Sequence, residues 1–99
     1  MYDNKFLGKM KFAEILVTGK VQGVWFRDFV KKNAITLNLN GWVKNNPDGN
    51  VSAAIEGEES IINQIIEQIK IGSPLSKVNN VKVNWLPFEN KFNSFKIIR

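Results

Sequence analysis

Three residues that could together bind an anion follow one another at intervals of four: Gly19, Gly23 and Arg27. They lie between an apolar segment and an amphipathic one. Glycines let the backbone curl so that successive N–H groups point at one place, and a helix that starts directly afterwards adds the positive end of its dipole. An arginine in the first turn can hold two phosphate oxygens at once, whereas lysine is a single point charge. Residues 19–27 therefore predict a phosphate-binding loop, named here the cradle loop.

The glycine spacing excludes two familiar nucleotide-binding loops. It matches neither the Gly-x-Gly-x-x-Gly dinucleotide motif nor the loop that ends in Gly-Lys-Ser/Thr. By itself, a loop with two glycines before a helix is weak evidence, because many such turns only connect two elements. Other motifs in the chain are needed to establish whether this loop binds a ligand.

The amino-acid composition narrows the chemistry that the chain can perform. The sequence contains no Cys and no His, which excludes a disulfide, a thiolate nucleophile, a Cys/His zinc site and an imidazole base. The net charge of +5 favours anionic partners. The net charge alone does not distinguish phosphate esters, anhydrides and nucleic acid as partners.

Length and apolar content indicate one globular domain. A chain of 99 residues, 43% of them apolar, has room for a single core. Residues 1–11 show no periodicity, so we predict a poorly ordered leader before a domain at residues 12–99. No run approaches the roughly 18 apolar residues of a membrane span, and residues 1–11 have no secretory signal. We therefore expect a cytoplasmic protein with no membrane contact.

The periodicity of apolar residues predicts alternating strands and helices. Strands are expected at residues 12–18, 39–44, 50–56, 81–86 and 95–98. Helices are expected from Phe26 to a left-handed cap near Asn38, and from residues 57–60 to a stop at residues 72–74. An Asn-Pro-Asp-Gly turn at residues 46–49 joins the second and third strands as a hairpin.

This order of elements predicts an α+β fold, the ferredoxin-like split βαβ plait. Right-handed crossovers give a βαββαβ unit whose four antiparallel strands are ordered 4-1-3-2, with both helices on one face and a short fifth strand at an edge. The cradle loop then lies beside the second and third strands rather than the fourth. That position brings Asn45 towards Arg27.

Two motifs carry a resemblance to a known family. The first is V-x-G-x-V-Q-G-V-x-F-R at residues 17–27, and the second is G-W-V-K-N at residues 41–45, followed by Gly49, Val51 and Gly57. Both resemble the signatures of acylphosphatases, small plait-fold enzymes that hydrolyse the carboxyl-phosphate bond of acyl phosphates. The resemblance covers residues 17–57 and extends through the order of elements to the last strands.

The resemblance implies a role for each matching residue. Arg27 and Asn45 are the implied catalytic residues, with Asn45 orienting the attacking water. The phosphoryl group is expected to be bound by Arg27 and by the backbone of Val21, Gln22, Gly23 and Val24. We expect no cofactor and no metal, an acyl phosphate as the small-molecule partner, and a monomer. Inorganic phosphate or sulfate is expected to compete for the same place.

The chemistry of acyl phosphates suits a chain with these residues. The leaving group is a carboxylate whose conjugate acid has a pKa of about 4 to 5, as in Asp and Glu side chains, so it departs without an added proton. The transition state of phosphoryl transfer is loose, so positioned hydrogen-bond donors supply most of the catalysis. A carboxamide can orient the water with one donor and one acceptor.

Two other functions remain open at this stage. The same fold hosts RNA-binding modules, but residues 51–56 lack the paired aromatic residues that stack bases, and the lysines are scattered. We therefore expect no nucleic-acid partner. The other alternative is a non-enzymatic anion-binding domain, which the presence of both Arg27 and Asn45 disfavours. Asp28 and Glu56 are not expected to act as general bases, since an Asp in the first turn of a helix usually interacts with the helix dipole.

Overall fold

The computed structural model describes residues 8–99 of the chain. Its elements in chain order are β1 (Met10–Lys20), α1 (Phe26–Thr36), β2 (Asn40–Asn45), β3 (Val51–Glu58), α2 (Glu59–Ile71), β4 (Lys77–Pro87) and β5 (Phe95–Ile97). Residues 1–7 of the predicted leader lie outside the described residues. Met10 and Lys11, which the prediction placed in the leader, are the first residues of β1.

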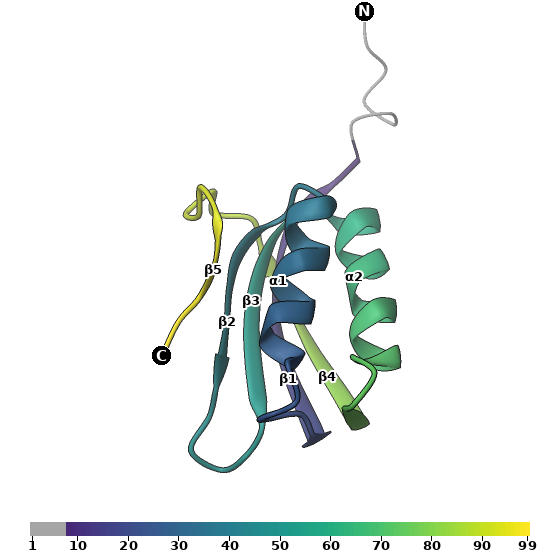
Figure 1. Ribbon diagram of the computed structural model, residues 1–99. Coiled ribbons are helices and arrows are strands. Elements are labelled where there is room, and N and C mark those ends of the chain that lie inside the picture. Colours follow the sequence, from purple (N-terminus) through teal and green to yellow (C-terminus); the bar gives the residue numbers. More distant parts are fainter. Residues whose placement is uncertain (1–7) are drawn as a thin grey trace, which may run out of the picture.

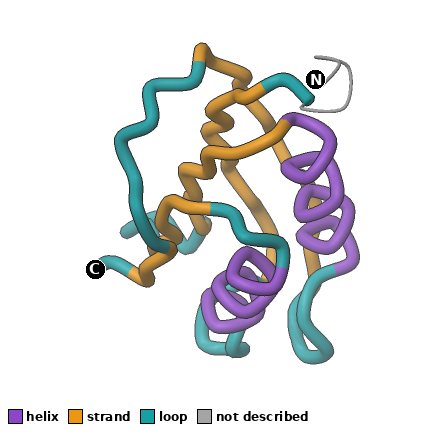
Figure 2. Tube along the Cα trace, turned by 90° about the horizontal axis from the view of Figure 1, so that it is seen from above, coloured by secondary structure: helices purple, strands orange, loops and turns teal. Residues whose placement is uncertain are grey.

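The strands form one sheet in the order β4-β1-β3-β2-β5. The first four strands pair antiparallel, and β5 pairs parallel with β2 at the edge. Both helices cover the same face of this sheet (Figures 1 and 2). The predicted plait is therefore confirmed, and the parallel β5 makes the sheet mixed. Within residues 8–99, no helix combines the length and the apolar character that crossing a membrane requires.

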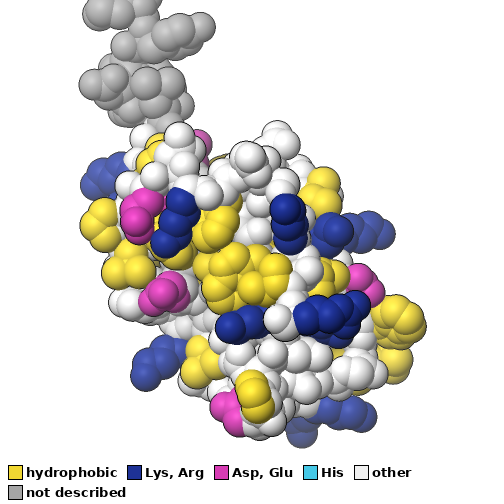
Figure 3. Space-filling model, turned by 90° about the vertical axis from the view of Figure 1, so that its left-hand side faces the viewer, with side chains coloured by type: hydrophobic (Ala, Val, Ile, Leu, Met, Phe, Trp, Pro, Cys, Tyr) yellow, Lys and Arg dark blue, Asp and Glu magenta, His cyan; other side chains and the backbone are white. Residues whose placement is uncertain are grey.

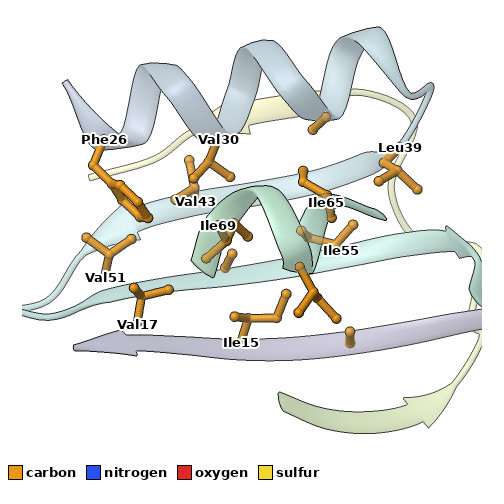
Figure 4. Close-up of a cluster of buried hydrophobic side chains, with 14 of the residues drawn as sticks. Ile15, Val17, Phe26, Val30, Leu39, Val43, Val51, Ile55, Ile65 and Ile69 are labelled. Atoms are coloured by element: carbon orange, nitrogen blue, oxygen red, sulfur yellow. The ribbon is translucent and has the colours of Figure 1, made fainter. Parts of the chain in front are cut away.

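The core lies between the helices and the sheet. Ala13, Ile15 and Val17 alternate along β1 and are buried, as a strand with one covered face requires. Figure 4 shows Ile15 and Val17 in one cluster with Ile65 and Ile69 of α2. The residues of α1 that reach this layer are buried and spaced three or four apart: Phe26, Val30 and Ala34.

The opposite face of the sheet has no helix and is partly covered by the segment between β4 and β5. Phe12 is buried there beneath Phe92, with the rings edge-on and their centroids 6.0 Å apart. Figure 3 views the molecule from the side of β5 and shows apolar side chains in the middle with Lys and Arg side chains spaced around them. The cationic side chains on this view are scattered, as the sequence predicted.

A buried carboxylate holds the segment between β4 and β5 in place. Glu56 of β3 is 3% exposed. Its Oε2 accepts hydrogen bonds from the N–H groups of Glu89 and Asn90, at 2.9 and 3.0 Å. Its Oε1 accepts from Lys91 and Phe92, at 2.9 and 3.3 Å. Both oxygens are therefore occupied by backbone donors, which makes Glu56 a structural residue and not a general base.

The strand boundaries differ most from the prediction in β4. The predicted strand began at Val81, whereas β4 begins at Lys77, because Lys77, Val78 and the polar Asn80 also pair with β1. The end of α1 is close to the prediction, with Asn38 in the left-handed region at φ 57°. The predicted hairpin is present, and Asn46 N–H donates to the Asn50 carbonyl at 2.8 Å.

Candidate active site

The two glycines of the first motif have different positions and different roles. Gly19 lies inside β1, at a register shift in its pairing with β4. A Cβ on Gly19 would lie 2.1 Å from the Lys77 carbonyl oxygen, so the close approach of two strands requires glycine there. The expectation that Gly19 helps to curl the loop is therefore wrong. In the structure, β1 extends to Lys20 and α1 begins at Phe26, so the cradle loop is limited to residues 21–25. Of the two glycines only Gly23 lies in it, with φ 71° and open space where a Cβ would stand.

The cradle loop ends at a helix start whose N–H groups lack a side-chain cap. The N-cap residue of α1 is Trp25, in the left-handed conformation with φ 63°, and its side chain makes no capping hydrogen bond. The Phe29 N–H donates to the Trp25 carbonyl at 3.0 Å. The N–H groups before it have no partner inside the helix, since an α-helix leaves its first donors unsatisfied. Donors and the positive dipole end therefore meet at this loop.

The cradle loop is held in place from two sides. The Gln22 Nε2 group donates to the backbone carbonyls of Asn46 and Asn50, each at 2.8 Å. These hydrogen bonds join the loop to the turn between β2 and β3, as the predicted topology requires. On the other side, the Ser73 hydroxyl donates to the Val24 carbonyl at 3.2 Å. The loop therefore also contacts the segment before β4, which the sequence did not predict.

A hollow of about 340 Å³ opens beside the cradle loop and the first turn of α1. Arg27 is half-buried, and neither ion pair that the structure records within residues 8–99 involves it. Such a guanidinium is available to an anion in the hollow. The lining residues come from the cradle loop, the start of α1 and the end of the chain: Val21, Gly23, Trp25, Phe26, Arg27, Asp28, Ile97 and Arg99.

Asn45 lies close to the loop but does not line the hollow. It is the last residue of β2 and pairs with Val51. Among the described residues, its buried Oδ1 atom has no hydrogen-bond partner. A buried amide oxygen without a donor carries a desolvation cost, which a water or a ligand donor would remove. The structure thus places Arg27, Val21 and Gly23 at one hollow. Asn45 is outside its lining, directly before the Asn46 carbonyl that Gln22 binds, and has one acceptor to satisfy.

Two lining residues were not found by sequence reasoning. Ile97 and Arg99 belong to β5 and the residues after it, and β5 reaches the hollow only because it pairs with β2. A three-residue strand gives a weak pattern, so only the spacing of Phe95 and Ile97 could have indicated which side chains face the helices. Within residues 8–99, no three His, Cys, Asp or Glu side chains are grouped closely enough to hold a metal ion.

Comparison with known proteins identifies the family. The sequence model of the acylphosphatase family matches residues 13–97. The chain belongs to the acylphosphatase family. Among curated relatives, an acylphosphatase from Methanococcoides burtonii is 41% identical over 87 residues, which is 88% of this chain and 91% of that one. An acylphosphatase from Pelotomaculum thermopropionicum is 36% identical over 85 residues, which is 86% of this chain and 92% of that one.

A solved structure of the acylphosphatase family has the same fold. The crystal structure of acylphosphatase from Bacillus subtilis superposes with a TM-score of 0.87 and 39% identity, covering 90% of this chain and 99% of that one. The family predicted from the two motifs is therefore confirmed, and so is the plait. The comparisons also support an acylphosphatase enzyme.

Proposed function

We propose that this acylphosphatase-family chain hydrolyses the carboxyl-phosphate bond of acyl phosphates at the hollow beside the cradle loop. The observation that supports this most is that Arg27, Gly23 and the uncapped start of α1 meet at one hollow. A guanidinium, a positive dipole end and backbone donors together suit a tetrahedral oxyanion. The products are a carboxylate and inorganic phosphate.

The proposed phosphoryl site consists of Arg27 and the backbone of residues 21–24. Arg27 and the N–H groups of Val21, Gln22, Gly23 and Val24 bind the equatorial oxygens, where charge is spread in the transition state. The Gln22 side chain serves a different purpose, because its hydrogen bonds to Asn46 and Asn50 hold the loop in shape. The backbone donors are thereby in place before the substrate binds.

Asn45 is proposed to orient the attacking water. Its Oδ1 accepts one water proton and its amide nitrogen donates to the water oxygen, so that a lone pair points at phosphorus. The new bond joins the water oxygen to phosphorus, and the bond from phosphorus to the carboxyl oxygen breaks. The carboxylate keeps the electron pair, and the proton that the water loses ends on the phosphate product. No acid, metal or cofactor is needed for this leaving group.

The location, the oligomeric state and the partners of the chain are proposed on the same basis. We expect a cytoplasmic monomer whose partner is a small acyl phosphate. Inorganic phosphate and sulfate should compete, because the N–H donors recognise the tetrahedral anion and not the acyl group.

Hydrolysis of benzoyl phosphate, followed by its loss of ultraviolet absorbance, tests this function. We expect turnover that is unchanged by a chelator and competitively inhibited by inorganic phosphate. A rate abolished by the chelator would contradict a metal-independent mechanism. A rate that saturating phosphate leaves untouched would contradict binding at the cradle loop.

A further inference from the structure

The outer wall of the hollow carries two exposed side chains that phosphate binding does not need. Trp25 is 75% exposed, although it is the largest side chain in the cradle loop. Arg99 is also exposed and lines the same hollow. An exposed indole and a guanidinium together offer an apolar face and a cation to whatever extends from the phosphoryl group.

Arg99 is directed to this hollow by the pairing of β5. Val43 of β2 pairs with Ile97, and the Ile98 N–H donates to the Val43 carbonyl at 2.9 Å. Phe95 and Ile97 contact the core under the helices, whereas Lys96 between them is exposed. Side chains alternate along a strand, so Phe95 and Ile97 face the helices, and Arg99, two residues beyond the end of β5, lines the hollow. The backbone hydrogen bond of Ile98 fixes the chain directly before it.

The geometry of the reaction sends the acyl group towards this outer wall. In an in-line displacement the water and the leaving group lie on opposite sides of phosphorus. Asn45, which is proposed to hold the water, has a buried Oδ1 and does not line the hollow. The leaving carboxylate therefore points away from Asn45, into the hollow and towards its exposed rim. Trp25 and Arg99 are the large side chains there.

We propose that Arg99 is a specificity-determining residue that selects acyl phosphates carrying a second anionic group on the acyl part. The inference rests on the proposed function of the hollow. The charged side chains that line the hollow are Arg27, Arg99 and Asp28, so the sum of their side-chain charges is positive. Arg27 binds the phosphoryl group, and Arg99 binds the second anionic group at the far end of the acyl part. A neutral acyl group gains only the apolar contact with Trp25.

Non-hydrolysable ligands test this without turnover. Phenacylphosphonate has a methylene in place of the bridging oxygen, and 4-carboxyphenacylphosphonate adds the second anion. Calorimetric titration of the full chain should show the carboxylated ligand bound about threefold to fivefold more tightly, the range of an exposed ion pair. Arg99→Gln should remove this preference, and Arg99→Lys should retain part of it. Lys96→Gln, the same loss of charge on the exposed side of β5, should leave the preference intact.

Inorganic phosphate separates failure of the inference from failure of the proposed function. Arg99→Gln should leave the Kd of inorganic phosphate within about twofold of the wild-type value. If the wild-type chain bound the two phosphonates equally, or if the preference survived in Arg99→Gln, the specificity role would be overturned. Equal loss of inorganic phosphate and of the carboxylated ligand in Arg99→Gln would make Arg99 a second phosphate ligand instead. If the wild-type chain bound neither inorganic phosphate nor phenacylphosphonate, both the proposed phosphate site and the specificity role of Arg99 would be contradicted.

Discussion

At the scale of single residues, the backbone of Trp25 is the most unusual feature of the site. A bulky residue in the left-handed region stores about 1 to 3 kcal/mol of strain, and Trp25 has φ 63°. Its indole is mostly exposed, so packing of this side chain stabilises the fold little. The residue therefore costs stability at the rim of the hollow, which is where strain is expected to accompany function.

Replacing Trp25 with glycine should stabilise the fold and weaken contact with the acyl group. Glycine adopts this conformation without strain, although it loses more chain entropy on folding, so we expect Trp25→Gly to raise the free energy of unfolding by about 0.5 to 1 kcal/mol. Urea unfolding measures this. The Kd of inorganic phosphate should not change, whereas phenacylphosphonate should bind more weakly. A loss of stability above about 1 kcal/mol would mean that the indole packs more than its exposure indicates.

At the scale of elements, the two glycines of the first motif separate folding from binding. Gly19→Ala would place a Cβ against the backbone of β4, so we expect it to destabilise the chain by about 2 to 4 kcal/mol. Gly23→Ala meets no neighbour and costs only about 1 kcal/mol for its φ of 71°. It should instead weaken phosphate binding, because the methyl group stands in the cradle loop. Thermal unfolding and phosphate titration of both variants test this division.

Thermal unfolding and phosphate titration would also reveal the opposite assignment of the two glycines. If Gly19→Ala unfolded like the wild type but lost phosphate, Gly19 would belong to the binding loop after all. If Gly23→Ala kept full phosphate affinity, the donors of residues 21–24 would not be the ones that bind the anion.

The segment between β4 and β5 depends on one carboxylate. In Glu56→Gln, an NH₂ group would face two backbone N–H donors in place of an acceptor, so we expect a loss of about 2 to 4 kcal/mol in unfolding free energy. Urea unfolding measures the loss. Glu14→Gln, on the exposed part of the same sheet face, is the matched control and should change stability by less than about 0.5 kcal/mol. Equal effects of the two substitutions would remove the structural role of Glu56.

Element boundaries were predictable where burial produces a pattern and not where the backbone alone pairs. The alternation of Ala13, Ile15 and Val17 predicted β1 because one face is covered. The early residues of β4 pair with β1 as an edge strand, and the exposed Asn79 and Asn80 leave no apolar signal. Gly19 was misassigned for a related reason, since a bulge inside a strand looks like a loop in the sequence.

At the scale of the whole molecule, the topology was predictable because few arrangements satisfy right-handed crossovers between the predicted elements. Two lysines that face solvent, Lys77 and Lys82, lie on the edge strand β4, and lysines on an edge oppose pairing with another sheet. This agrees with the proposed monomer, which sedimentation of the purified chain can test.

The site was predictable only where its residues stand in one motif or its partner motif. Arg27 and Asn45 were candidates because the two motifs are specific. The Gln22 side chain binds backbone carbonyls, and Arg99 follows a strand of only three residues. The position of each depends on which strands become neighbours. Such contacts leave no spacing in the sequence to detect.

Comparing Arg27→Ala with Asn45→Ala distinguishes the proposed roles, in which Arg27 holds the phosphoryl group and Asn45 holds only the water. Each variant should fold, and Lys32→Ala, an exposed cation of α1 outside the hollow, is the control. We predict that Arg27→Ala loses phosphate affinity and lowers kcat by about 10² to 10³. Asn45→Ala should keep the Kd of phosphate within about twofold and lose activity almost wholly in kcat. Normal turnover by Asn45→Ala, or a loss of phosphate binding as large as in Arg27→Ala, would contradict this account.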